Sequence, residues 1–300
     1  MSTSGLTDHR TALECLPPTR GVGKHSDEVL QWGLPRLRDL PWRHTRDPWA
    51  ILVSEVMLQQ TQALRVIPRY QQFLATFPTP AACAEVPLGD VLRLWQGLGY
   101  PRRARNLHAA ARAIVELGEF PSTLDGLLAL PGVGQYTARA VRTFAFELDS
   151  AVVETNIARV LARVAGQRLT AGEAQRAADD ALPGGRSWEW NQCLMDLGAV
   201  LCRPASPHCE CCPLADGCAW HGDGVDPAVG SAAVSIRQAR FDGSDRQARG
   251  RLLKALGDAP VLPDRCAGVM GCDDVRAMRL VDELEGEGLL VRTGDALRLP

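Results

Sequence analysis

The sequence is poor in lysine, in aromatic residues and in net charge. Only two of its 33 basic residues, Lys24 and Lys254, are lysine, aromatic residues make up 5% of the chain, and the net charge is -2. A chain so close to neutral lacks the general positive charge of many nucleic-acid-binding proteins. A nucleic-acid surface would therefore have to be local, and the arginine-rich segment YPRRARNLH at 100–108 is the best candidate.

Long apolar runs are also missing. No stretch of 18 or more apolar residues occurs, and residues 1–24 lack the apolar core of a signal peptide, so we expect neither a membrane-spanning helix nor a secretory leader. We expect a cytoplasmic, nucleoid-associated monomer with a flexible tail over 1–24. Apolar residues make up 46% of the 300-residue chain, which is enough for one large domain plus a small one.

Helical periodicity dominates the chain, which predicts a mainly α protein. Asp47-Pro48 is a good helix start, because the aspartate can cap the helix and proline suits the first turn. No alternating strand pattern precedes residue 230. We expect a catalytic region over 25–220, a Gly- and Asp-rich linker over 221–244 and a second domain over 245–300.

The second domain reads as two helices followed by a β-hairpin. The hairpin turn is predicted at Thr293-Gly294-Asp295, between two short apolar runs. Helices followed by a hairpin are typical of a small winged-helix unit. Its second helix, DDVRAMRLVDELE, is acidic and therefore unsuited to a DNA groove. We expect this unit to pack against the rest of the protein or against a partner.

Ten cysteines in a cytoplasmic chain indicate a metal or redox site rather than disulfides. Four follow the spacing Cys202-x6-Cys209-x2-Cys212-x5-Cys218, and four thiolates suit either a zinc ion or a [4Fe-4S] cluster. Zinc ribbons usually pair two short knuckles and this loop has one, which favours the cluster over zinc or free thiols. Cys211 lies off the spacing and is not expected to be a ligand.

The segment LPGVGQYTARAV, residues 130–141, predicts a helix–hairpin–helix. Its Gly-Val-Gly turn would let backbone N–H groups at a helix N-terminus approach a DNA phosphate closely. As a bare pattern, the turn could equally be an ordinary connection. The residues expected at the DNA backbone are Leu130, Gly132, Val133, Gly134 and Gln135.

These motifs occur in the order found in one family. LPWRHTRDPWAILVSEVMLQQTQ, LWQGLGYPRRARNLH, LPGVGQYTARAV, NQCLMDLGAVLC and the cysteine loop resemble the helix–hairpin–helix DNA glycosylases with an iron–sulfur loop, in particular the MutY-type adenine glycosylases. The resemblance covers Leu40–Cys218. It implies a six-helix barrel over 49–149, and a cluster domain formed by 25–48 together with 150–220.

Glu55 is the acidic residue of SEVMLQQTQ. A glycosylase flips its base out of the duplex and cleaves the C1′–N9 bond, and adenine leaves readily only once a ring nitrogen is protonated. A carboxylic acid in apolar surroundings, as Val53 and Val56 provide, keeps its proton towards neutral pH. The resemblance makes Glu55 the general acid at N7. The alternative is a structural pair with an arginine.

Other residues are expected at the DNA. The resemblance implies that Gln60 and Tyr100 enter the base stack, although Tyr100 could instead be a core aromatic. Helical spacing would place Gln59 on the same face as Glu55 and turn Gln60 away from it. Thr61 and Arg105 complete the expected DNA-binding set.

Three further residues bear on the reaction. Tyr136 stands where endonuclease III relatives carry a nucleophilic lysine, and a phenol cannot form a Schiff base, so a monofunctional enzyme is expected. The family's catalytic aspartate aligns with Glu154, whose carboxylate lies one methylene further out. We expect it to stabilise the oxocarbenium-like sugar. Asn156 corresponds to a pocket residue of the family.

Residues 219–300 depart from the family, because typical MutY proteins end in a Nudix-like domain that reads the oxidised guanine. A preference for 8-oxoguanine would have to come from the catalytic region, or be weak or absent. The expected function is excision of adenine opposite 8-oxoguanine or guanine in double-stranded DNA. The alternatives are a thymine or uracil mismatch glycosylase and a non-catalytic iron–sulfur DNA-binding regulator.

Overall fold

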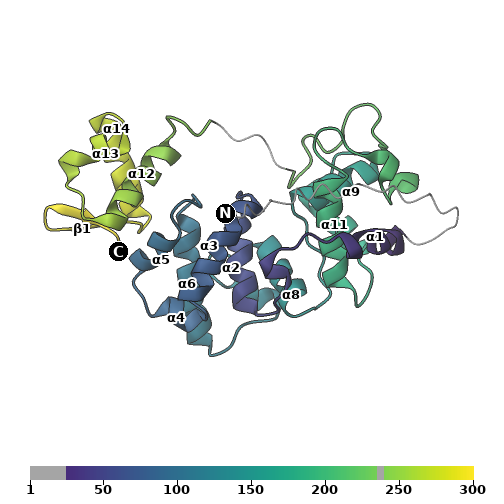
Figure 1. The fold of residues 1–300 in the computed structure, drawn as a ribbon, viewed down its shortest axis with the longest axis horizontal. Coiled ribbons are helices and arrows are strands. Elements are labelled where there is room, and N and C mark those ends of the chain that lie inside the picture. The colour runs from purple at the N-terminus through teal and green to yellow at the C-terminus, as the bar shows by residue number, and fades with distance from the viewer. Residues whose placement is uncertain (1–24, 235–239) are drawn as a thin grey trace, which may run out of the picture. The chain divides into compact units, whose positions relative to one another are not determined.

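The computed structural model describes residues 25–234 and 240–300, and its regular structure is almost entirely helical (Figure 1). The tail predicted for residues 1–24 lies outside the described residues. Within the described residues, no helix combines the length and the apolarity needed to cross a membrane. The chain forms two compact units. The described residues of the larger unit are 39–150 and 240–300, and we call residues 240–300 the C-terminal part. Those of the smaller unit are 25–38 and 151–234.

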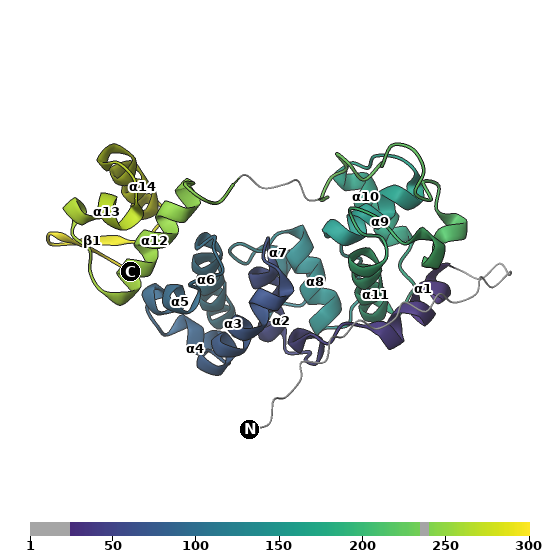
Figure 2. The same cartoon turned by 45° about the horizontal axis from the view of Figure 1, so that its top comes forward.

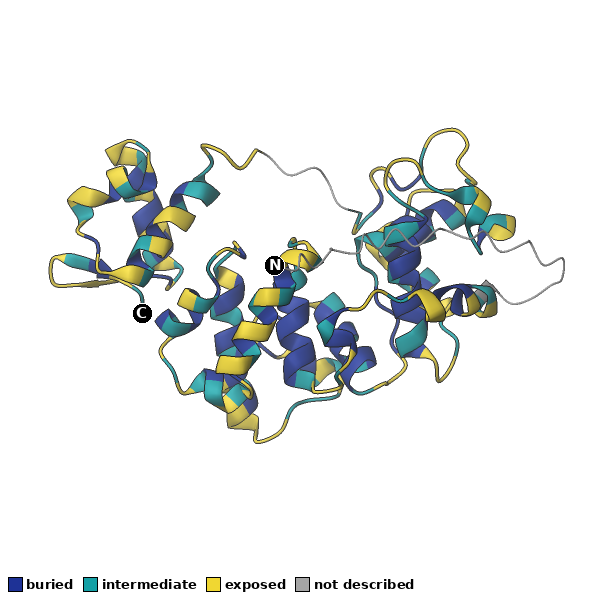
Figure 3. Ribbon diagram, in the orientation of Figure 1, coloured by how far each residue is buried: buried dark blue, intermediate teal, exposed yellow. Residues whose placement is uncertain are grey.

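The larger unit is built around one enclosed helix, α2 (Pro48–Leu58). Asp47 caps it by accepting hydrogen bonds from the backbone of Trp49 and Ala50, as the sequence predicted. The helix is apolar on nearly every face and is buried from Trp49 to Met57 (Figure 3). The other helices of residues 39–150 are α3 (Ala63–Thr76), α4 (Pro80–Ala84), α5 (Leu88–Leu94), α6 (Arg102–Leu117), α7 (Leu124–Leu128) and α8 (Gln135–Ala145).

The C-terminal part of this unit has the predicted hairpin. Strands β1 (Val291–Thr293) and β2 (Ala296–Arg298) pair antiparallel, and Val261 bridges to β2. Between the two predicted helices, α12 (Asp245–Asp258) and α14 (Asp274–Gly286), lie a 3-10 turn (Pro263–Arg265) and the short helix α13 (Cys266–Met270), where only a break was expected. A five-residue apolar segment is too short for periodicity to reveal.

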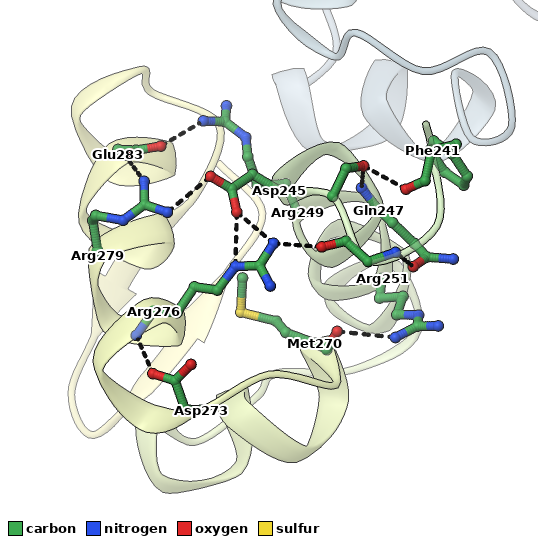
Figure 4. A network of polar contacts seen from close by, with 12 residues as sticks. Phe241, Asp245, Gln247, Arg249, Arg251, Met270, Asp273, Arg276, Arg279 and Glu283 are labelled. Atoms are coloured by element: carbon green, nitrogen blue, oxygen red, sulfur yellow. Dashed lines mark hydrogen bonds and ion pairs between the residues drawn. The ribbon is translucent and has the colours of Figure 1, made fainter. Parts of the chain in front are cut away.

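Ion pairs on the surface join these helices (Figure 4). Asp245 of α12 pairs with Arg276 and Arg279 of α14, and Arg249 pairs with Glu283. Beneath them Leu252 of α12 and Leu280 of α14 are fully buried. The charges that made α14 look acidic are therefore partly neutralised within the unit.

The smaller unit is a helical layer that carries the cysteine loop (Figure 2). Helix α11 packs against both α1 and α9. Close packing explains two glycines, because a Cβ on Gly33 would lie 2.5 Å from the sulfur of Cys193, and one on Gly198 would lie 2.7 Å from Cβ of Asn156. The helices are α1 (His25–Gly33), α9 (Thr155–Ala165), α10 (Ala171–Asp180) and α11 (Ser187–Val200), with 3-10 turns at Leu34–Arg36, Cys209–Cys211 and Ala215–Gly217.

Candidate active site

Glu55 lies in the last turn of α2, where the residue is only 4% exposed. Its neighbours Ser54 and Val56 are also buried, and α2 is covered by α3, α6 and α8. The apolar setting predicted for this carboxyl group is therefore present. Because a helix C-terminus carries a partial negative charge, it adds to the free-energy cost of ionising a carboxyl group there.

Helix α2 is shorter than the sequence predicted, because Gln59 and Gln60 were both expected to lie on it. Helix α2 ends at Leu58, Gln59 is its C-cap, and Gln60 is exposed with a left-handed φ of 56°. Assigning both glutamines to helical faces was therefore wrong. The buried guanidinium of Arg103 stabilises this ending by donating to the backbone oxygens of Val56 (2.8 Å) and Gln59 (2.6 Å).

Arg103 also holds the loop that carries Tyr100. Its guanidinium donates to the backbone oxygens of Leu98 (2.9 Å) and Gly99 (3.0 Å), and to the hydroxyl of Thr61 (3.2 Å). Burial lowers the pKa of Arg103 to about 10, against the opposing effect of Tyr100. One side chain thus ties the end of the Glu55 helix to the tyrosine loop.

Tyr100 is half-buried and sits in a strained loop. It has φ of 49°, in the left-handed region that side chains rarely adopt, and it follows Gly97 (φ 88°) and Gly99 (φ 72°). Its ring lies 5.5 Å from the guanidinium carbon of Arg103. The ring is therefore held at the edge of the fold rather than within its core.

The hairpin between α7 and α8 has the geometry of a backbone clamp. Gly132 has φ of 75°, and a Cβ there would lie 2.5 Å from Cβ of Asn106. Gly134 caps α8 without any side-chain hydrogen bond, and both glycines and Gln135 are exposed. The N–H groups at the start of α8 therefore face an open surface that could accept a phosphate. Leu130 and Val133 are buried, so only their backbones could contribute.

Tyr136 lies on the first turn of α8, which packs against α2. It is half-buried, and the next residue, Thr137, accepts a 3.5 Å hydrogen bond from the amide of Gln59. The helices that carry Glu55 and Tyr136 are thus direct neighbours. Arg105, in contrast, donates to the backbone oxygen of Glu287 in the C-terminal part.

Glu154 belongs to the smaller unit, where it caps the N-terminus of α9. One carboxylate oxygen accepts from the backbone N–H groups of Asn156 (2.8 Å) and Ile157 (2.9 Å), and the other accepts from the Asn156 amide (3.1 Å). Burial raises the pKa of the Glu154 carboxyl, while these N–H groups and the nearby Arg159 and Arg38 act in the opposite direction. The extra methylene is therefore accommodated within a helix cap.

A chain of hydrogen bonds leads from Glu154 to the cysteine loop. Asn156 accepts from Arg159 (2.7 Å), and Arg159 donates to the backbone oxygen of Cys202 (2.7 Å). Arg163, one turn further along α9, donates to the sulfur of Cys202 (3.3 Å). The loop is thus anchored directly on the helix that Glu154 caps.

The four predicted metal ligands, Cys202, Cys209, Cys212 and Cys218, all line one cavity. Among the described residues, no three His, Cys, Asp or Glu side chains are close enough together to hold a single ion. A zinc ion needs four sulfurs at about 2.3 Å from one point, whereas a cubane cluster bonds each cysteine to a different iron. The four cysteines at one cavity therefore form a donor set that suits an iron–sulfur cluster.

Comparison with known proteins agrees with this geometry. Residues 53–183 match the model of the HhH-GPD superfamily of base excision DNA repair proteins. The adenine DNA glycosylase of Mycobacterium tuberculosis is 40% identical over 291 residues, which cover 93% of this chain and 94% of that protein. The human adenine DNA glycosylase is 41% identical over 63% of this chain. The chain belongs to the adenine DNA glycosylase family.

Solved structures confirm the predicted fold class. A thermostable thymine-DNA glycosylase matches with a TM-score of 0.61 and 31% identity, over 65% of this chain and 94% of that one. Endonuclease III in a non-covalent DNA complex matches with a TM-score of 0.58 and 25% identity, over 65% of this chain. Both support the mainly α, helix–hairpin–helix glycosylase fold. Because the mycobacterial match covers 93% of this chain, it includes most of the C-terminal part as well.

Proposed function

We propose that this protein is a monofunctional glycosylase that removes adenine mispaired with 8-oxoguanine or guanine from double-stranded DNA in base excision repair. The observation that carries the proposal is the buried carboxyl group of Glu55 in a member of this family. The helix of Glu55 packs directly against the helix that bears Tyr136. Strand cleavage would need a lysine nucleophile at the position that Tyr136 occupies. We place its action on nucleoid DNA in the cytoplasm.

The reaction begins when the adenine nucleotide is flipped out of the duplex. The exposed clamp at Gly132, Gly134 and Gln135 holds the phosphate backbone, while Gln60 and Tyr100 occupy the space left in the stack. The protonated Glu55 then gives its proton to N7 of adenine. As the C1′–N9 bond breaks, its electron pair leaves with the base.

The sugar that remains has oxocarbenium character. The Glu154 carboxylate stabilises this positive charge. The N–H groups of Asn156 and Ile157 fix the orientation of the carboxylate. A water molecule then adds to C1′, and its proton returns to a carboxylate. The products are free adenine and an abasic site in an uncut strand.

Cys202, Cys209, Cys212 and Cys218 would hold a [4Fe-4S] cluster, which supplies ligation energy that stabilises the fold. Arg163 is 1% exposed and donates to the Cys202 sulfur, so its charge would offset the negative charge of the ligated thiolates. With such a cluster the protein should be brown and absorb at about 400 nm, whereas a zinc protein would be colourless.

The function is tested with purified protein and duplexes that contain a single A:8-oxoguanine, A:G, T:G or U:G pair. Product is detected by cleavage at abasic sites in hot alkali, and a sample without alkali tests for strand cleavage by the protein itself. We expect alkali-dependent cleavage at adenine only. Cleavage without alkali would contradict the monofunctional assignment.

A thymine or uracil mismatch glycosylase is the second candidate. A thymine-DNA glycosylase structure is 31% identical to this chain, and Glu154 departs from the adenine family's aspartate. Cleavage at T:G or U:G without cleavage at adenine would select this activity. Failure to cleave any duplex would favour a DNA-binding regulator instead.

A further inference from the structure

The C-terminal part of the chain contacts the tyrosine loop that the proposed function places at the DNA. In helix α12, the guanidinium of Arg246 donates to the hydroxyl of Tyr100 at 2.8 Å. The same guanidinium carbon lies 5.8 Å from the centre of the Tyr100 ring and 5.7 Å from that of Phe241. Arg246 thus sits beside two aromatic rings, one from each part of the unit.

Further contacts hold α12 and α14 beside this loop. Glu287, the C-cap of α14, pairs with Arg102 at 2.7 Å and also with Arg249 of α12. The Glu287 side chain is 10% exposed and that of Arg249 18%, whereas that of Arg102 is 63% exposed, so the pair with Arg249 is the more sheltered of the two. The backbone oxygen of Glu287 accepts from Arg105. The first turn of α6, which follows Tyr100, is therefore attached to the C-terminal part at two arginines.

The loop needs such support because of its backbone conformation. A non-glycine residue in the left-handed region is strained, and it persists only where its surroundings fix it. Arg103 fixes the carbonyl groups before Tyr100, whereas the phenol hydroxyl is bound by Arg246 within the part of the chain that the structure describes. The two arginines together hold both the backbone and the ring.

We propose that Arg246 is a positioning residue that holds the Tyr100 ring ready to enter the base stack, so that the C-terminal part strengthens engagement of the mispair without touching a base. The proposal rests on the proposed function, because it takes the Tyr100 loop to be the part that inserts into DNA. It assigns the C-terminal part to the preparation of that loop rather than to base recognition. Ordering the ring before DNA arrives lowers the conformational cost of binding.

The test compares Arg246→Ala with the full-length wild-type protein on an A:8-oxoguanine duplex. Affinity is measured by titration, and base unstacking by the fluorescence of 2-aminopurine placed beside the mispaired adenine. The loss of the charge-assisted bond and the cation–π contact that Arg246 makes to Tyr100 should weaken binding and unstacking about fivefold to tenfold. Arg246→Lys keeps the charge and should recover part of the loss. Arg265→Ala, an exposed arginine of the same part (77% side-chain exposure), should change neither.

The same measurements in a Tyr100→Ala background separate positioning from a general structural role. If Arg246 acts through the ring, Arg246→Ala should add nothing there. An equal loss in both backgrounds would overturn the proposal, as would tighter binding by Arg246→Ala, which would mean that the contact restrains Tyr100. Thermal unfolding of each variant shows whether the fold is intact.

Failure of the proposal can be told from failure of the proposed function. If Tyr100→Ala leaves binding and unstacking unchanged while adenine is still excised, the positioning role is overturned and the glycosylase assignment stands. If no variant or wild-type preparation excises adenine, the assigned reaction is wrong. The binding and fluorescence cycle would still decide the role of Arg246, because neither measurement requires excision.

Discussion

The two carboxyl groups assigned to the reaction have opposite surroundings. Glu55 is enclosed in the last turn of an apolar helix, at the end where the helix dipole is negative. Glu154 caps the first turn of α9, where the dipole is positive and two backbone N–H groups bind one of its oxygens. Glu55 lies at the C-terminal end of its own helix, whereas at Glu154 the backbone N–H groups and nearby arginines counter part of the effect of burial, which still raises the pKa of that carboxyl group. The proposed roles, proton donation by Glu55 and charge stabilisation by Glu154, thus assign the same functional group to two different settings.

Replacing Glu55 should have the largest effect. Glu55→Gln removes the transferable proton but keeps the shape of the side chain, so excision should fall by a factor of about 10³ or more while duplex binding is retained. Single-turnover assays and a binding titration measure the two separately. Glu116→Gln, at an exposed position of α6, is the matched control. A fully active Glu55→Gln would contradict its role as the acid.

Replacing Glu154 should have the next largest effect. Glu154→Gln removes the negative charge that the proposed reaction uses to stabilise the sugar, which should lower the single-turnover rate about 100-fold. Glu154→Asp keeps both the charge and a good helix cap, so its rate should stay within about tenfold of wild type. Equal single-turnover rates for Glu154→Gln and Glu154→Asp would show that the negative charge of Glu154 does not contribute to the reaction.

The reaction rate should fall at acidic pH as Glu154 becomes protonated. Because burial raises its pKa, the anion should be lost on acidification at a higher pH than for an ordinary glutamate, and the single-turnover rate should fall with it. The effect on stability has the opposite sign. Because the pKa of Glu154 is higher in the folded protein than in the unfolded chain, its protonation stabilises the fold at a pH below the unfolded-state pKa. This stabilisation is lost as the pH rises through the folded-state pKa. A profile unchanged in Glu154→Gln would contradict the assignment.

A smaller effect is expected at Gly198, which lets α11 approach α9. In Gly198→Ala the new Cβ would lie 2.7 Å from Cβ of Asn156 and 2.8 Å from its backbone oxygen, so α9 must shift at its capped end. We expect a loss of about 1–3 kcal/mol in the free energy of unfolding and about a tenfold slower reaction. Chemical denaturation and single-turnover kinetics measure both. Gly250→Ala, where an added Cβ meets nothing within 4 Å, is the control.

Local chemistry in the sequence accounts for much of the fold. Asp47-Pro48 correctly predicted the start of α2, and Thr293-Gly294-Asp295 predicted the final hairpin. Both signals lie within a few residues of the structure they specify. The end of α2 was missed because it depends on Arg103, a residue of another helix.

The site was only partly accessible from the sequence for the same reason. Arg103 lies on the buried stripe of α6 that continues through Leu107 and Ile114, so helical periodicity could have identified it as inward-facing. Nothing local could have paired Arg246 with Tyr100, because that contact joins residues 146 positions apart. Long-range polar contacts of this kind depend on the packed fold.

The most direct test of the proton transfer changes the substrate rather than the protein. In a duplex with 7-deazaadenine opposite 8-oxoguanine, a C–H group replaces the N7 atom that Glu55 should protonate. We predict that wild-type protein binds this duplex with an affinity close to that for adenine but releases no base. Release of 7-deazaadenine at the rate of adenine would show that no proton from Glu55 to N7 is needed, and would contradict the central claim.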